Sequence, residues 1–149
     1  MARPQFAASR RRTIAPSVFF GETLIGSVDS LATSDSKNVF AATAPVTGTI
    51  SKFTGYLSGL GSGVGSQPFR VVIYADSSGN PGALLKISDE VIILDSSAFA
   101  WYDFILPTPL AVTAGTTYWI GYYIGSPNQG SQIKGFSGFG LKFNTNNYA

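Results

Sequence analysis

Short apolar runs recur along the chain, and polar, glycine-rich or proline-containing segments separate them. The runs are rich in Val, Ile, Tyr, Phe and Thr and lack helical spacing, which indicates β-strands. We expect strands at residues 24–28, 38–42, 48–57, 69–74, 83–87, 91–94, 101–106 and 117–124, and a last one formed by Phe136 and residues 141–143. The run at 117–124 gives the strongest signal, and we expect the run at 101–106 to end at Pro107.

The connecting segments have the composition of turns. Residues 77–82, Ser-Ser-Gly-Asn-Pro-Gly, predict a tight turn, and residues 113–116 predict another. Residues 59–66 are glycine-rich and predict a loop, whereas residues 34–38 are the one segment where we consider a short helical turn. Many short strands without long helical segments predict an all-β fold, an antiparallel β-sandwich or jelly roll.

The first residues differ from the rest of the chain. Pro4 and Pro16 interrupt them, so we expect an extended arm at residues 1–16 and one sandwich domain at 17–149. A chain of 149 residues suits a single domain with a sizeable core.

The composition narrows the chemistry that the chain can perform. Charged residues make up 12% of the sequence, and Cys and His are absent. Without Cys there is neither a disulfide framework nor a thiolate metal site. Without His the chain lacks the commonest general base and the commonest transition-metal ligand. We expect a protein that is not an enzyme and needs no cofactor.

Positive charge is concentrated in the arm. Four of the ten basic residues are Arg3, Arg10, Arg11 and Arg12, and from Thr13 onward six basic residues face eight acidic ones. We expect the arm to contact a neighbouring subunit through Arg3, Phe6 and Arg10–Arg12. Nucleic acid is the less favoured partner, because the body has no basic strand with interleaved aromatic residues.

No apolar run approaches the roughly 18 residues that a membrane-spanning helix needs, so we expect no membrane contact. The apolar stretch at 14–20 is short, contains Pro16 and is followed by Glu22, unlike a signal peptide. We expect the arm to belong to the working protein.

Two segments resemble the β-sandwich domains of phage virion proteins and bacterial surface proteins. Residues 72–85, Val-Ile-Tyr-Ala-Asp-Ser-Ser-Gly-Asn-Pro-Gly-Ala-Leu-Leu, resemble a strand–turn–strand unit of these domains. Residues 110–120, Leu-Ala-Val-Thr-Ala-Gly-Thr-Thr-Tyr-Trp-Ile, resemble their later hairpin. With Trp101 and Phe104 between them, the resemblance covers about residues 48–124. It implies a jelly-roll-like sandwich, a fold that serves adhesion, carbohydrate binding and virion assembly alike.

The aromatic strand at 117–124 offers one candidate binding surface. Alternation places Tyr118, Ile120, Tyr122 and Ile124 on one face and Trp119, Gly121, Tyr123 and Gly125 on the other. Trp119 and Tyr123, together with Trp101, form a candidate glycan platform, in which glycine leaves room for a sugar ring. The alternative is that one face belongs to the core and the other packs against a neighbouring strand or subunit.

Acidic residues offer two further candidates. A glycosidase needs two carboxyl groups across a cleft, but Glu22, Glu90, Asp89 and Asp95 form no evident pair, and Asp103 stands out only because it lies in an aromatic strand. Asp76, Ser78 and Asn80 form a weak candidate calcium loop without the final Glu of an EF-hand, and a plain turn explains them equally. The glycine-rich segment at 59–66 lacks the Lys-Ser/Thr ending of a phosphate-binding loop.

These observations predict a non-enzymatic virion structural protein, a phage capsid decoration or a tail or fibre component. Its partners would be other copies of itself and neighbouring virion subunits, and it would assemble in the host cytoplasm. We expect a symmetric oligomer, a trimer by analogy with virion proteins. The alternative is a carbohydrate-binding or adhesion module for a cell-surface glycan.

Overall fold

The computed structural model describes residues 24–32, 35–61, 65–125, 131–135 and 142–144. These ranges contain ten strands, no helix and only antiparallel pairings. The prediction of an all-β, antiparallel fold is therefore confirmed. The expected arm at 1–16, with Arg3, Phe6 and Arg10–Arg12, lies outside the described residues, and so do Phe136 and Leu141.

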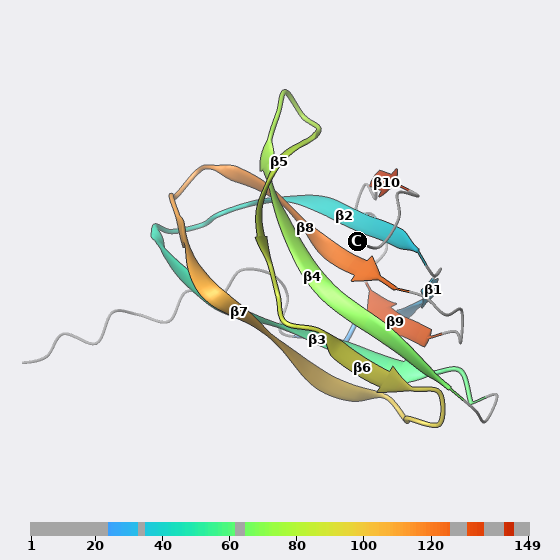
Figure 1. Ribbon diagram of the computed structural model, residues 1–149. Coiled ribbons are helices and arrows are strands. Elements are labelled where there is room, and N and C mark those ends of the chain that lie inside the picture. Colours follow the sequence, from blue (N-terminus) through green and yellow to red (C-terminus); the bar gives the residue numbers. More distant parts are fainter. Residues whose placement is uncertain (1–23, 33–34, 62–64, 126–130, 136–141, 145–149) are drawn as a thin grey trace, which may run out of the picture.

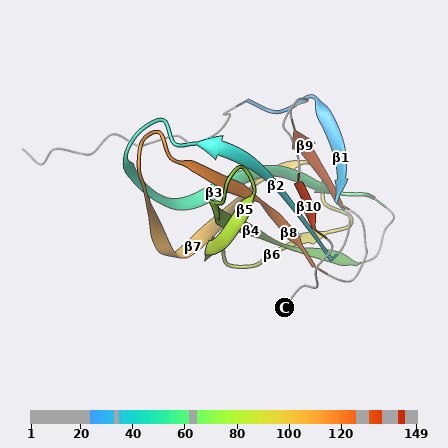
Figure 2. The same cartoon turned by 90° about the horizontal axis from the view of Figure 1, so that it is seen from above.

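The strands form two sheets (Figure 1). Sheet A has the order β1-β9-β3-β7. Its strands are β1 (Val28–Ala32), β9 (Ser131–Gly135), β3 (Gly48–Gly59) and β7 (Ala100–Val112). Sheet B has the order β10-β2-β8-β4-β5, and β6 also pairs with β4. Its strands are β10 (Lys142–Asn144), β2 (Ser36–Thr43), β8 (Thr117–Ile124), β4 (Ser66–Asp76), β5 (Pro81–Ile87) and β6 (Val91–Leu94). Figure 2 shows the same strands from above.

Strands β5 and β6 lie end to end along one edge of β4. β5 pairs with the second half of β4, and β6 pairs with the first half. Ser88, between them, is buried, and its Oγ accepts a hydrogen bond of 2.8 Å from the backbone N–H of Val71. The next residue, Asp89, donates its N–H to the carbonyl of Ile105 in β7. This junction therefore ties the edge of sheet B to the edge of sheet A.

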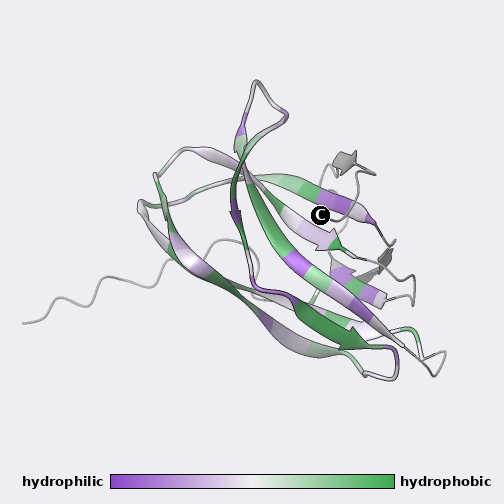
Figure 3. Ribbon diagram, viewed as in Figure 1, coloured by the Kyte–Doolittle hydropathy of each residue, from purple (hydrophilic) through white to green (hydrophobic). Residues whose placement is uncertain are grey.

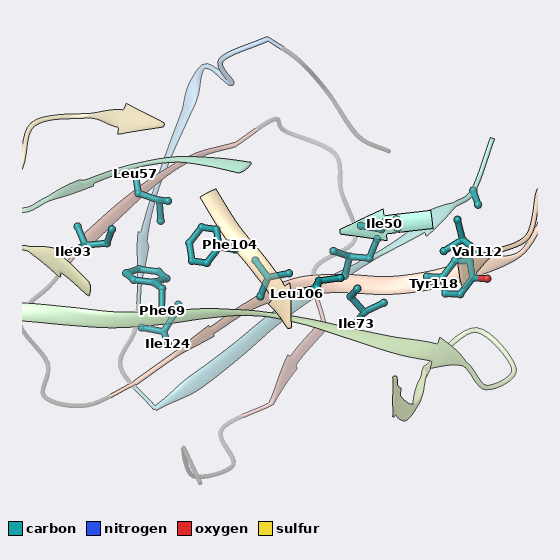
Figure 4. Close-up of a cluster of buried hydrophobic side chains, with 13 residues drawn as sticks. Ile50, Leu57, Phe69, Ile73, Ile93, Phe104, Leu106, Val112, Tyr118 and Ile124 are labelled. Carbon is teal, nitrogen blue, oxygen red and sulfur yellow. The ribbon is translucent and has the colours of Figure 1, made fainter. Parts of the chain in front are cut away.

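The core lies between the two sheets (Figure 4). Leu57 and Phe104 enter it from sheet A, and Phe69, Ile73 and Ile124 enter it from sheet B. All five side chains are fully buried. Burial of each such side chain stabilises the fold by roughly 1.5–3 kcal/mol, so the two facing layers form one β-sandwich-like unit.

The alternation predicted for the aromatic strand is confirmed. Tyr118, Ile120 and Ile124 belong to the core between the sheets. Trp119 and Tyr123 belong to a second, smaller cluster on the opposite face of sheet B. Both faces of β8 are thus apolar.

Strand β7 continues past the proline where we expected it to end. It runs to Val112 and includes Pro107 and Pro109. β7 is an edge strand, where a missing N–H need not remove a sheet hydrogen bond. The register with β3 also shifts between Ile50 and Lys52, so residues 106–109 of β7 fall within an irregularity of the pairing.

Three other expectations differ from the structure. The first described strand is β1, at Val28–Ala32, and not at residues 24–28. Residues 36–38 begin β2, so no helical turn covers them. β9 was not predicted, because the sequence Ser-Gln-Ile-Lys-Gly has one apolar residue and no clear alternation. Its strand character comes from pairing with β1 and β3.

The expected tight turn at 77–82 is confirmed as the connection between β4 and β5. Ser77 and Asn80 exchange backbone hydrogen bonds of 2.8 and 3.2 Å, which leaves Ser78 and Gly79 as a two-residue loop. Both have positive φ, 54° and 77°. These values define a type I′ turn, whose twist suits a β-hairpin.

Candidate functional site

Sheet A turns one face toward the core and the other away from it. Because adjacent residues of a strand point to opposite faces, the neighbours of the buried Leu57 and Phe104 point outward. Three cross-strand pairs between β3 and β7 lie on this outward face: Tyr56 with Trp101, Thr54 with Asp103, and Lys52 with Ile105. We call these six side chains the sheet A surface.

One end of the sheet A surface is aromatic. The ring centroids of Tyr56 and Trp101 are 5.0 Å apart and tilted by 54°. The other neighbour of Tyr56 is Phe99, stacked at 5.4 Å with an angle of 14°. Lys134 of β9 places its Nζ 4.9 Å from the centroid of Phe99. Trp101 remains 48% exposed, so this cluster presents an indole to solvent on a rigid strand.

The adjacent part of the sheet A surface is polar and charged. Lys52 donates a hydrogen bond of 2.7 Å to Oδ2 of Asp103, and Thr54 donates one of 2.6 Å to Oδ1. The bond from Lys52, and then that from Thr54, lowers the pKa of Asp103 below its usual value. Asp103 is therefore an ionised acceptor at neutral pH, the opposite of the raised pKa that a glycosidase needs in its general acid.

The structure does not bring the three expected platform residues together. Trp101 belongs to the sheet A surface, whereas Trp119 and Tyr123 lie in sheet B and are buried. The indole Nε1–H of Trp119 donates a hydrogen bond of 2.8 Å to Oδ1 of Asp76. The Nζ of Lys37 lies 4.7 Å from the centroid of the Tyr123 ring. Trp119 and Tyr123 thus pack within the fold and present no open ring face.

The glycine between these two aromatic residues has a different role from the one we expected. A Cβ on Gly121 would fall on the backbone carbonyl of Asn38 in β2. The space beside Gly121 is therefore filled by the neighbouring strand and leaves no room for a sugar ring. Gly121 is required because β2 and β8 approach closely at this point.

The weak calcium candidate takes part in the hairpin turn. Asp76 accepts the Trp119 bond at one carboxylate oxygen and a 3.2 Å bond from the N–H of Gly79 at the other. The side chain of Asn80 donates to the carbonyl of Ser78 at 3.4 Å. These contacts account for Asp76 and Asn80 as a turn that also holds Trp119 in place.

The other acidic residues are dispersed. Glu90 lies 3.5 Å from Arg70 in β4, and Asp95 is buried in the connection between β6 and β7. Glu22 lies outside the described residues. Across the described ranges, no three side chains of His, Cys, Asp or Glu gather at one point.

A second exposed surface lies on sheet B. In β6, Ile93 is fully buried in the core, so Ile92 and Leu94 point away from it and are 47% and 55% exposed. We call Ile92 and Leu94 the β6 surface, which Figure 3 shows as a strongly hydrophobic strand. The sequence Val-Ile-Ile-Leu did not predict this exposure, because a strand without polar residues does not indicate which face meets solvent.

Sequence reasoning also missed Tyr56 and Phe99. Tyr56 lies in β3 and meets Phe99 and Trp101 only because β3 pairs with β7 in the folded chain. Strand pairing over such a separation leaves no local signal. The aromatic content of both segments was the one available hint.

A comparison of the chain with protein-family models gives no match, and a comparison with curated proteins gives none either. Within the ranges that the structure describes, there is no helix with the length and apolarity needed to cross a membrane.

Proposed function

We propose that the chain is a non-enzymatic structural protein of a virion, a phage capsid decoration or a tail or fibre component, with a jelly-roll fold. With β5 and β6 counted as one strand interrupted at residues 88–90, the orders β1-β9-β3-β7 and β2-β8-β4-β5 support a jelly roll, in which β10 would be an addition at the edge. Viral capsid proteins and lectins share this fold, so the fold alone does not decide the function.

The observation that supports assembly is the β6 surface. Ile92 and Leu94 expose aliphatic side chains on a strand that, in the described part of the chain, pairs with β4 alone. An exposed apolar strand at the edge of a sheet readily pairs with another chain. We infer that β6 meets a second copy of the chain.

The N-terminal arm has a separate part in this proposal. Its four arginines contrast with the mildly acidic remainder of the chain, and such complementarity favours contact with a neighbouring subunit. We propose that Arg3, Phe6 and Arg10–Arg12 make that contact. If a chain lacking residues 1–12 enters particles as efficiently as the full chain, the role of the arm is refuted.

Analytical ultracentrifugation of the full chain over a concentration series tests the assembly proposal. We expect a concentration-dependent oligomer that Leu94→Lys shifts toward monomer. Leu84→Lys in β5 is the matched control, because Leu84 is 53% exposed and Leu94 is 55% exposed. A wild-type protein that stays monomeric throughout, or an equal effect of both substitutions, would refute assembly through β6.

A further inference from the structure

The sheet A surface combines two kinds of chemistry side by side. Trp101 and Asp103 are two residues apart on the same face of β7, a separation of about 6.6 Å along a strand. Their cross-strand partners, Tyr56 and Thr54, have the same arrangement on β3. A ligand that covers the Trp101 ring therefore reaches the Asp103 carboxylate without any change in the backbone.

We propose that the sheet A surface binds a neutral glycan, with one pyranose ring stacked on Trp101 and its hydroxyl groups bonded to Asp103 and Lys52. This goes beyond the assembly function and uses the opposite sheet. A pyranose has an apolar face of C–H groups and a rim of hydroxyls. It therefore matches an aromatic ring that is bordered by charged hydrogen-bonding groups.

The aromatic half of the site is pre-organised. Tyr56 lies between Phe99 and Trp101, with ring centroids 5.4 and 5.0 Å away. These contacts hold the indole in place while leaving it 48% exposed. A side chain that is fixed before the ligand arrives loses little conformational entropy on binding.

The polar half retains capacity for hydroxyl groups. Each oxygen of Asp103 accepts one bond, Oδ2 from Lys52 and Oδ1 from Thr54. A carboxylate offers about four acceptor positions, so each oxygen can accept one more bond from a sugar hydroxyl. The Lys52 ammonium has three donors, and its bond to Asp103 uses one of them.

A glycan fits the sheet A surface better than a second copy of the chain does. Lys52 and Asp103 form an exposed ion pair, with side chains about half exposed. Lys and Asp are depleted in protein–protein interfaces, whereas aromatic residues are enriched. The purely aliphatic β6 surface meets the requirements of a protein contact, and the mixed sheet A surface meets those of a sugar.

A microarray of neutral gluco- and galacto-oligosaccharides, probed with the full chain, tests the proposal. We expect saturable binding that Trp101→Ala weakens by at least about tenfold and that Asp103→Asn weakens by several fold. Trp101→Phe retains an aromatic ring and should retain most of the binding. Leu84→Ala, on the other sheet, is the control and should bind as wild type does.

A second measurement uses the wild-type protein and therefore does not depend on the folding of the Trp101 variants. Titration of the wild-type protein with the best-bound oligosaccharide should change the emission of the exposed Trp101. The absence of saturable binding to every printed glycan refutes the proposal, as does binding that neither Trp101→Ala nor Asp103→Asn alters. A change in oligomeric state in Trp101→Ala, without glycan binding by wild type, would identify the surface as a protein contact instead. The β6 experiment concerns the opposite sheet, so either proposal can fail alone.

Discussion

The hydroxyl of Tyr122 in sheet B lies against Gly55 in sheet A, so that a Cβ on Gly55 would overlap it. Tyr122 therefore spans the core, and its ring also meets Phe69 and Phe104 edge-on. We predict that Gly55→Ala lowers the free energy of unfolding by roughly 1–3 kcal/mol, because the added methyl overpacks the core. Urea denaturation measures the change.

The cause of this loss can be isolated by a double-mutant cycle. In a Tyr122→Phe background the hydroxyl is gone, and Gly55→Ala should cost less than it does in the wild type. If Gly55→Ala costs the same in both backgrounds, the packing of Tyr122 against Gly55 does not explain the requirement for glycine.

Tyr122 also predicts a loss of stability at high pH. Burial raises the pKa of Tyr122 from 10.0 to about 12. Between these values the unfolded chain releases the phenolic proton while the folded chain keeps it, so stability falls as pH rises. The loss is about 1.4 kcal/mol by pH 11 and levels off near about 3 kcal/mol only above pH 12, since one pKa unit corresponds to about 1.4 kcal/mol.

Urea denaturation at pH 9 and pH 11 checks this effect. Tyr122→Phe should remove most of the difference that Tyr122 causes. Tyr74, whose pKa is also raised by burial, accounts for a remaining part. An identical pH dependence in wild type and Tyr122→Phe would contradict the prediction.

A substitution in the hairpin turn should instead raise the stability of the protein. Ser78 has a φ of 54°, a conformation that Asn adopts more readily than Ser. We expect Ser78→Asn to stabilise the protein by about 0.5 kcal/mol and Ser78→Val to destabilise it by more. Thermal unfolding measures both, with Ser77→Asn as the neighbouring control. No difference between Ser78→Asn and Ser78→Val would refute the assignment of the turn.

The two tryptophans should be distinguishable in solution. Trp119 is buried and bonded to Asp76, whereas Trp101 is half exposed. Acrylamide should therefore quench the emission of Trp101 much more than that of Trp119. In Trp101→Phe the remaining emission should be poorly quenched, and in Trp119→Phe it should be readily quenched. Equal quenching in the two variants would contradict the placement of these residues.

Local patterns predicted much of the fold. The alternation of β8 correctly placed Ile120 in the core and Trp119 on the other face, because each position depends only on its neighbours in sequence. The tight turn at 77–82 was also predicted correctly, because its turn-forming residues are adjacent in the sequence. In contrast, β9 was missed because its strand character depends on pairing with β1 and β3.

The candidate site could not be predicted from local sequence patterns. Trp101 and Trp119 are equally aromatic, yet one is exposed in sheet A and the other is buried in sheet B. Which strands pair, and which face is covered, is decided by contacts between distant segments. The partnership of Trp101 with Tyr56 therefore emerged only from the register of β3 and β7.

We propose that this scaffold acts through its surfaces, and first through β6. The most direct test is amide hydrogen exchange at Val91–Leu94, measured below and above the concentration at which the chain associates. We predict that exchange in β6 slows above that concentration, while exchange in the hairpin around Ser78 and Gly79 stays the same. Unchanged exchange in β6 in the associated state would refute assembly through β6.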